Sequence, residues 1–463
     1  MSFISMDFLV FFFPAALLGY YLFFFSKTMQ RIWLFLSSLF FYALGAPTGF
    51  VVVLVLLLWD WIFGMLFKSR KTGGRVNVIL IIGVVGNLLP VLFFKYMYEQ
   101  GKFLPVGLSF VMLSGISYLS DVYAGRTTTA KNPFTLGLYL FYFPKLLAGP
   151  AVGFEEFTAQ MGGQKLTLRR SAVGCCRFVT GLSKKVILAD TLAQLADIVF
   201  NYSAMGRENV TVPVVMAWLG LFAFTLQIYF DISGYADMAI GLSLMFGIIM
   251  EENVNYPYRA VSVSDFWERF YISLTNWFQR YVFEPLGGRK DNMDKTVRNL
   301  FLMWLVIGMW YGVGGKFFLW CLWQFLFILA ELFLGYGENN PHTALMRIYT
   351  LSVVVVGWVV FRAQDLYQAG QFYMNMFGAN YNSIWNGMTG ILLLEYWPYL
   401  AIGCLLCTPV AKKANNWLVN GKNGRVGRVA VTLCYPVVMA AVLLLSLGYL
   451  MQGVGKPFLY SLY

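Results

Sequence analysis

Charged side chains are scarce in this chain. They make up 12% of its 463 residues, whereas hydrophobic residues make up 59%, and the mean hydropathy is +0.65. Soluble domains carry about 25% charged residues. Apolar runs recur from one end of the sequence to the other, so its length indicates one polytopic domain rather than two or three soluble ones. The sequence therefore predicts an integral membrane protein.

Histidine and paired cysteine are scarce as well. The one histidine, His342, lies in the polar loop GENNPHTA, where we expect a solvated side chain rather than a catalytic one. A single histidine cannot build a histidine-based metal site. Cys404 and Cys407 stand at CxxC spacing, but no second pair follows, and we expect them to pack within a membrane helix. No metal is expected.

The excess of basic residues gives a net charge of +12. In a soluble protein this would suggest nucleic acid as a partner, but here the basic residues lie between apolar runs, where they fix membrane topology. We therefore expect membrane lipids and no nucleic acid as partners. Residues 6 to 25 lack a basic lead-in and a cleavage site, which indicates a first membrane helix. The basic loops after the first, third and fifth spans place the N-terminus outside; they contain Lys27, Arg31, Lys68, Arg70, Lys71, Arg75, Arg126 and Lys131.

The apolar segments predict an all-α polytopic fold with roughly 11 to 13 membrane helices, because the alternating pattern of a closed barrel is missing. They lie near 7–25, 31–46, 49–67, 77–94, 104–122, 133–150, 212–230, 232–250, 299–313, 316–335, 345–361, 390–410 and 429–451. Two further segments, 166–200 and 261–285, mix charged and apolar residues at helical spacing, which is typical of interfacial or cavity-lining helices. We expect the second to begin at an N-cap, Ser264 or Asp265, and to carry Trp267, Phe270 and Tyr271 near one side.

Polar residues within the apolar runs are the candidates for function, because burying them in a membrane is costly. The stretch QIYFDISGYADMAIGL (227–242) contains Asp231 and Asp237, which are expected to face an interior cavity or to pair within a structural hydrogen-bond network. In IGMWYGVGG (307–315), the phenol of Tyr311 stands between Trp310 and Gly312.

Five stretches resemble, in order, the signatures of the membrane-bound O-acyltransferase family, specifically its bacterial alginate O-acetyltransferase branch. They are LPVGLSFVMLSGISYLSDVYAG (104–125), FPKLLAGPAVGFEEF (143–157), GLSKKVILADTLAQLAD (181–197), LQIYFDISGYADMAIGLSLMFGIIMEENVNYPYRA (226–260) and GWVVFRA (357–363). The resemblance implies one multi-helix funnel with two cavities that meet at a narrow tunnel. Its N-terminal helices would cover about 1–130, the family core about 131–365 and the C-terminal helices about 366–463.

The resemblance also implies a site, at which this chain departs from the family pattern. That pattern is similar to DFWRRWHISLSxW and GxWHG, and Tyr271 and Tyr311 occupy its two histidine positions. Trp267 and Trp310 flank them, and these two residues would line the tunnel or cavity together with Asp231 and Asp237. An unperturbed histidine accepts a proton near pH 6.5, whereas a tyrosine titrates near 10. A neutral phenol can still donate a hydrogen bond to a thioester carbonyl or its oxyanion.

Two functions follow from the resemblance, and the residues leave both open. The first is O-acylation of an envelope polysaccharide at the bacterial cytoplasmic membrane, and the form that we expect is O-acetylation. Its acyl-CoA or carrier-protein thioester would meet a basic cytoplasmic face, and an esterase-fold partner, secreted or membrane-tethered, would complete transfer. That face would include Lys184, Lys185, Arg289 and Lys290. The second is a catalytically inactive relative that serves as a scaffold or as an export subunit. Near the C-terminus, Tyr460 in KPFLYSLY could relay the acyl group or anchor the tail.

Overall fold

The computed structural model describes residues 2–68, 75–101, 104–147, 149–163, 167–205, 211–289, 292–312, 314–335, 343–420, 424–453 and 455–458. Within these ranges the regular structure is helical, apart from an isolated antiparallel bridge between Val254 and Phe270. The first part of the chain contains η1 (Phe8–Phe12), α1 (Phe13–Leu22), α2 (Lys27–Gly45), η2 (Pro47–Gly49), α3 (Phe50–Lys68), α4 (Arg75–Glu99), α5 (Leu108–Tyr123), α6 (Pro133–Phe141), α7 (Phe143–Leu146) and α8 (Phe154–Gly163).

The central part contains α9 (Leu168–Ser183), η3 (Lys184–Ala189), α10 (Asp190–Met205), α11 (Val214–Met245), η5 (Pro257–Arg259), α12 (Val263–Arg269), α13 (Ile272–Phe278), η6 (Gln279–Phe283) and α14 (Met293–Tyr311). The last part contains α15 (Gly315–Leu334), α16 (Thr343–Arg362), α17 (Leu366–Met376), α18 (Gly387–Leu406), α19 (Val410–Asn420) and α20 (Gly424–Met451). Several helices begin at a side-chain cap that binds a free backbone N–H of the first turn. These caps are Ser26, Asn132, Thr167, Asn292, Asp365 and Asn386.

Seven helical segments in the described part of the chain are long and apolar enough to cross a membrane, which confirms the prediction of an all-α multi-span protein. They are Pro47–Phe67, Val78–Tyr98, Val214–Met245, Gly315–Leu334, Ala344–Arg362, Gly387–Leu406 and Leu433–Met451. The predicted separation of 212–230 from 232–250 is wrong, because α11 runs unbroken for 32 residues. The predicted segment 133–150 is divided between α6 and α7 at Tyr142, just before Pro144, where a helix loses a backbone donor.

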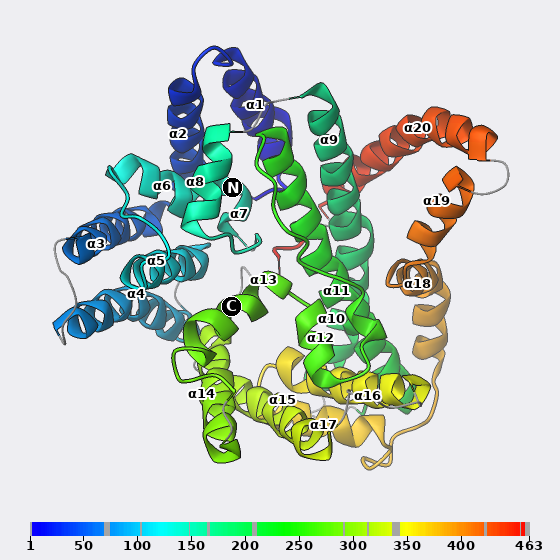
Figure 1. Ribbon diagram of the computed structural model, residues 1–463. Helices are drawn as coiled ribbons and strands as arrows, with labels where there is room; N and C mark the ends of the chain where they lie inside the picture. The colour runs from blue at the N-terminus through cyan, green and yellow to red at the C-terminus, as the bar shows by residue number, and fades with distance from the viewer. Residues whose placement is uncertain are drawn as a thin grey trace.

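Helix α11 is the buried centre of the molecule, and α9, η3 and α10 run alongside it (Figure 1). Glycines allow the backbones of α9 and α11 to approach each other closely. A Cβ placed on Gly181 would lie 2.5 Å from the carbonyl oxygen of Gly234, and one on Gly241 would lie 2.6 Å from that of Gly174. Small residues at such crossings are typical of helices packed within a membrane.

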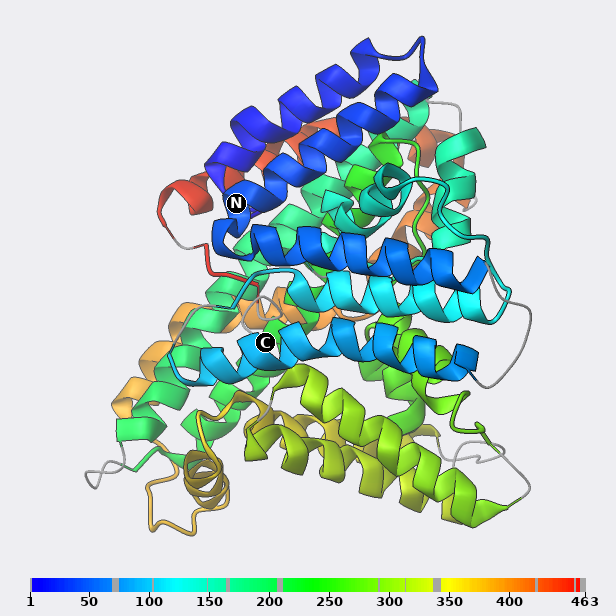
Figure 2. The ribbon, with the colours of Figure 1, turned by 90° about the vertical axis from the view of Figure 1, so that its left-hand side faces the viewer.

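The remaining helices surround this centre. Figure 2 shows the N-terminal helices, blue to cyan, stacked across one side of the molecule, with α14 and α15 beyond α4. Helices α18, α19 and α20 form an arm on the opposite side of α11 (Figure 1). After α20, residues 455–458 return to the centre, where the ring of Phe458 packs edge-on against Tyr235 at 4.9 Å.

Candidate functional site

Tyr271 interrupts the helix predicted for 261–285. It separates α12 from α13 and has a left-handed backbone, with φ 57° and ψ 54°. The predicted N-cap is also wrong: the side chain of Ser262 caps α12 by accepting a hydrogen bond from the N–H of Asp265 over 2.9 Å. A bulky residue at positive φ costs about 1 to 3 kcal/mol and persists only where its surroundings impose it, which is frequent at functional sites. Tyr271 is 2% exposed.

Asn253 imposes this conformation from the loop after α11. Its carbonyl oxygen accepts a hydrogen bond from the N–H of Ile272 over 2.9 Å, and its side-chain oxygen accepts one from the N–H of Ser273 over 2.9 Å. On the other side of Tyr271, the N–H of Asn255 donates to the carbonyl oxygen of Arg269 over 2.9 Å. The backbone on both sides of Tyr271 is therefore fixed to a single short segment.

Two carboxylates fix the neighbouring helices. Glu331 of α15 accepts hydrogen bonds from the first amides of α12, at 2.5 Å from Val263 N and 3.2 Å from Ser264 N. Asp121 of α5 holds η6 by accepting a hydrogen bond from the phenol of Tyr281 over 2.8 Å and by pairing with Arg280 at 3.2 Å. Burial and this adjacent carboxylate raise the pKa of Tyr281 above its ordinary value, so the phenol stays a neutral donor.

A cavity of about 460 Å³ lies against α12, α13 and α14, and we call it the α13–α14 cavity. Trp267, Tyr271 and Tyr311 all line it, so the structure brings together three of the residues singled out from the sequence. The complete lining is Ser264, Trp267, Glu268, Tyr271, Leu274, Thr275, Phe278, Gln279, Phe283, Glu284, Gly288, Arg289, Leu300, Met303, Trp304, Ile307, Tyr311 and Ile328.

A second cavity, of about 870 Å³, lies at the C-terminal end of α14, and we call it the α4–α17 cavity. Tyr311 lines this cavity as well as the first, and its side chain is 3% exposed. The complete lining is Lys95, Tyr98, Leu104, Tyr311, Gly312, Gly314, Gly315, Lys316, Phe317, Gln364, Asp365, Leu366 and Tyr367. One phenol thus stands between two cavities, with Trp310 packed edge-on against its ring at 4.9 Å.

Aromatic rings enclose the α13–α14 cavity behind the two tyrosines. The ring of Trp267 lies 5.6 Å from Trp304 and 5.5 Å from Trp320, and Trp320 lies 5.2 Å from Tyr311. The indole N–H of Trp267 donates to Gln324 over 3.2 Å. The indole N–H of Trp304 is buried and has no acceptor among the described residues.

Asp231 lies in a buried ion cluster and is not among the residues that line either cavity. Its carboxylate is 2.6 Å from the ammonium group of Lys185, which is also 2.7 Å from Asp190. Lys185 is 2% exposed, so the prediction that it belongs to a basic cytoplasmic face is wrong. One ammonium group between two carboxylates joins η3 and α10 to α11.

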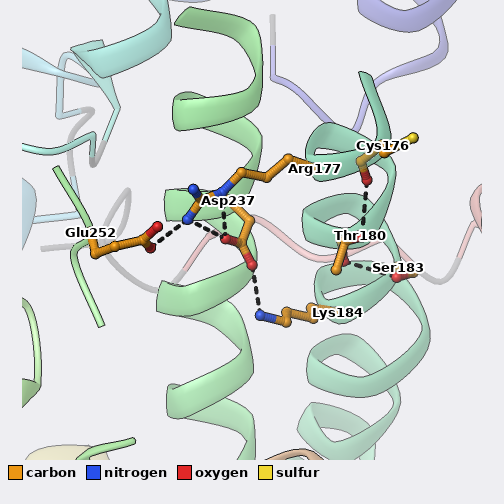
Figure 3. Close-up of polar contacts among 7 residues, drawn as sticks. All are labelled: Cys176, Arg177, Thr180, Ser183, Lys184, Asp237 and Glu252. Atoms are coloured by element: carbon orange, nitrogen blue, oxygen red, sulfur yellow. Dashed lines mark hydrogen bonds and ion pairs between the residues drawn. The ribbon is translucent and has the colours of Figure 1, made fainter. Parts of the chain in front are cut away.

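Asp237, six residues further along α11, is also paired with basic side chains. Figure 3 shows its carboxylate between two cations, with Arg177 of α9 at 3.0 Å and Lys184 of η3 at 2.6 Å. Arg177 also binds Glu252. Both aspartates of α11 are therefore paired with basic side chains of α9 or η3. The wide turn of η3 is where the adjacent Lys184 and Lys185 reach different aspartates.

Tyr460, His342 and Lys290 lie outside the described residues, whereas Arg289 lines the α13–α14 cavity. Sequence reasoning missed Asn253, Glu331 and Lys95. Of these, Lys95 carries a signal of its own, because it is an ionisable residue within the apolar run VLFFKYMY. Among the described residues, no group of three or more His, Cys, Asp or Glu side chains could hold a metal ion.

A family model and the sequences of known proteins indicate the same family for this chain. The model of the MBOAT, membrane-bound O-acyltransferase, family matches residues 126–367. A probable alginate O-acetylase AlgI of Pseudomonas fluorescens is 36% identical over 385 residues, which cover 81% of this chain and 76% of that protein. A peptidoglycan O-acetyltransferase of Helicobacter pylori is 29% identical, and the match covers 80% of this chain and 78% of that protein. A teichoic acid D-alanyltransferase of Bacillus subtilis is 20% identical, and the match covers 69% of this chain and 86% of that protein. This chain belongs to the membrane-bound O-acyltransferase family.

Proposed function

We propose that this protein transfers an activated acyl group for the O-acylation of an envelope polysaccharide. The acyl group that we expect is acetyl. The position of Tyr311, which lines two cavities at once, is the observation that carries the proposal. One cavity would receive the donor thioester and the other the acceptor hydroxyl, so that both reach the same phenol. The three relatives are named for related transfers, to alginate, to peptidoglycan and to teichoic acid.

In this proposal the acyl thioester, from acyl-CoA or a carrier protein, enters the α13–α14 cavity. Arg289 lines this cavity together with Glu268 and Glu284, and it is the cation that would pair with the phosphate groups of a donor. In this proposal the phenol of Tyr271 and the indole N–H of Trp304 donate hydrogen bonds to the thioester carbonyl oxygen. Such donors stabilise the negative charge that develops on this oxygen in the transition state.

The transfer step needs a proton to move as one bond forms and another breaks. The acceptor hydroxyl oxygen attacks the acyl carbon, the carbon–sulfur bond breaks, and the electron pair leaves with the sulfur. A phenol both accepts and donates a hydrogen bond. Tyr311 can therefore take the hydroxyl proton on its oxygen while it gives its own proton to the departing thiolate, without forming a free phenolate. This is how a tyrosine could serve where a histidine is expected.

The remaining expectations complete the proposal. The two cavities would face opposite sides of the cytoplasmic membrane, with the N-terminus outside, and an esterase-fold partner would pass the acyl group to the polymer.

The test of the proposed function is the amount of base-releasable acyl ester on the envelope polysaccharide of a deletion strain. We expect wild-type protein to restore the ester and the double variant Tyr271→Phe, Tyr311→Phe to fail. An unchanged ester content after deletion, together with defective polymer export, would instead indicate the inactive scaffold.

A further inference from the structure

Helices α3 and α4 each carry a buried polar side chain in the middle of an apolar run. Asp60 of α3 and Asn87 of α4 are fully buried, and they lie within two of the segments that are apolar enough to cross a membrane, Pro47–Phe67 and Val78–Tyr98. Neither residue lines the two cavities of the candidate site. A carboxyl group in such a place is costly unless it is paired with a cation or is neutral.

The side-chain amide of Asn87 has a fixed orientation. Its Nδ2 donates one hydrogen bond over 3.1 Å to the carbonyl oxygen of Gly83, on the preceding turn of α4. It donates a second one over 2.6 Å to Oδ1 of Asp60. An amide oxygen at this position could not donate to either group, so the nitrogen and the oxygen of the side chain cannot be exchanged. Both hydrogens of the amide are therefore in use.

The other two oxygen atoms of the pair, Oδ2 of Asp60 and Oδ1 of Asn87, have no hydrogen-bond donor among the described residues. Both approach the same point beside α5. A Cβ placed on Gly115 would lie 2.2 Å from Oδ2 of Asp60 and 2.6 Å from Oδ1 of Asn87. Buried acceptors without a donor are unfavourable, and a single hydrogen between these two oxygens would satisfy both.

No cation among the described residues pairs with Asp60. The buried titratable side chains on the helices packed against α3 have partners elsewhere. They are Lys95 of α4, Tyr118 and Asp121 of α5 and Tyr139 of α6, which bind Trp310, Ala130, Arg280 and Val152 respectively. Tyr118 lies close to α3, since a Cβ on Gly64, one turn after Asp60, would be 2.5 Å from its hydroxyl. A neutral phenol supplies no positive charge to the carboxyl group.

We propose that Asp60 binds a proton at neutral pH and that its carboxyl group and the amide of Asn87 form a closed pair of two hydrogen bonds. Oδ2 of Asp60 donates to Oδ1 of Asn87, while Nδ2 of Asn87 donates to Oδ1 of Asp60. An exposed aspartate titrates near about pH 3.9 and is ionised at neutral pH. A metal cation would also neutralise the carboxylate, but two oxygens are far fewer than the six or more ligands that Mg²⁺ and Ca²⁺ take.

The proton has a structural consequence for the candidate site. The pair joins α3 to α4 directly beside Gly115 of α5. Helix α5 in turn holds α13, because the indole N–H of Trp277 donates to the carbonyl oxygen of Leu113 over 3.1 Å and to the hydroxyl of Ser117 over 2.7 Å. The neutral pair therefore supports the helix against which the wall of the α13–α14 cavity packs. This inference does not depend on the proposed acyl transfer.

The test is infrared spectroscopy of the full-length protein in nanodiscs at about pH 7, where an exposed aspartate is a carboxylate. A protonated carboxyl group has a C=O stretching band that carboxylates lack. We expect this band in the wild type and its loss in Asp60→Asn. That variant should stay folded, because its amide can donate to Oδ1 of Asn87 in place of the acid hydroxyl. Asp294→Asn is the matched control, since Asp294 is an exposed aspartate of α14, and it should leave the band unchanged.

An acid band of equal size in the wild type and Asp60→Asn would overturn the proposal, as would an Asp60-dependent band that appears only below about pH 5. A band that sodium chloride removes and choline chloride does not would identify a metal cation at the pair and overturn it as well. If Asp60→Asn fails to fold, ¹³C-labelled aspartate gives the same reading without a substitution in the pair. The band should then shift to lower frequency, also in Asp190→Asn, which lacks another fully buried aspartate. An absent shift would contradict the bound proton.

Discussion

The carbonyl oxygen of Asn253 accepts a hydrogen bond from the backbone N–H of Ile272 over 2.9 Å, immediately after the left-handed residue Tyr271. The side-chain oxygen of Asn253 binds the next amide, that of Ser273. An asparagine in a loop thus sets the backbone of a buried tyrosine 18 positions later in the chain. The direction of the Tyr271 phenol in the α13–α14 cavity depends on this contact.

Asn253→Ala should lower acyl transfer about 10-fold while the protein stays folded. The change removes only the side-chain acceptor and leaves the Ser273 N–H buried without one, at a cost of about 1 to 3 kcal/mol. Asn253→Asp keeps an oxygen in place and should retain most of the activity. The measurement is the single-turnover rate per folded protein, with folding checked by gel filtration. Equal losses in the two variants would show that the oxygen does not position Tyr271.

The Trp304→Phe variant tests whether the indole of Trp304 binds a ligand or only packs against its neighbours. The variant keeps the ring packing and removes a buried N–H that has no acceptor among the described residues. If a thioester carbonyl supplies that acceptor, the transfer rate should fall about 10-fold, with the unfolding temperature unchanged or raised. Phe301→Leu, a change of a neighbouring packed ring on α14, controls for general loosening. A Trp304→Phe protein with the wild-type rate would exclude the indole from the reaction.

The Lys185 cluster predicts an asymmetry between two substitutions. Lys185→Met would leave the buried carboxylates of Asp190 and Asp231 facing each other, which should destabilise the protein by about 3 to 5 kcal/mol. Asp190→Asn leaves one ammonium group with one carboxylate and should cost much less. Thermal unfolding in detergent compares them. Similar unfolding temperatures for the two variants would contradict the ion cluster as described.

Gly181→Ala tests the crossing of α9 and α11. The added methyl group would lie 2.5 Å from the carbonyl oxygen of Gly234 and 2.6 Å from the N of Met238, and neither backbone atom can move alone. We expect a loss of about 1 to 3 kcal/mol from overpacking. Gly370→Ala is the control, since a Cβ there meets nothing within 4 Å, and it should stabilise α17 by about 0.5 to 1 kcal/mol. A tolerated Gly181→Ala would mean that the two helices separate easily.

The all-helical class was predictable because few structures other than helices satisfy the backbone hydrogen bonds of an apolar chain in a bilayer. The apolar runs that form α3, α4 and α15 are examples. Helix ends were less predictable. No periodicity reports the break at Tyr271, because it depends on Asn253 from a distant loop. Periodicity also cannot separate a single 32-residue helix such as α11 from two adjoining spans.

The candidate site was predictable in part. The resemblance selected Trp267, Tyr271 and Tyr311, and all three line one cavity. The second cavity was not accessible from local sequence, because it forms where the ends of α4, α14 and α16 meet the start of α15. The ion partners of Asp231 and Asp237 depend in turn on the π-helical turn of η3, which places adjacent lysines on different aspartates.

The most direct test of the account is acyl transfer by protein reconstituted in liposomes, with a radiolabelled acyl thioester on one side and the acceptor glycan, together with the esterase-fold partner, on the other. The compared proteins are the wild type, Tyr311→Phe and Tyr311→His. Because Tyr311 is assigned the proton transfer, Tyr311→Phe should lower the rate by roughly 10² to 10⁴, and Tyr311→His should retain or raise it. A Tyr311→Phe protein that forms ester at the wild-type rate would contradict the assignment of the reaction to the phenol between the two cavities.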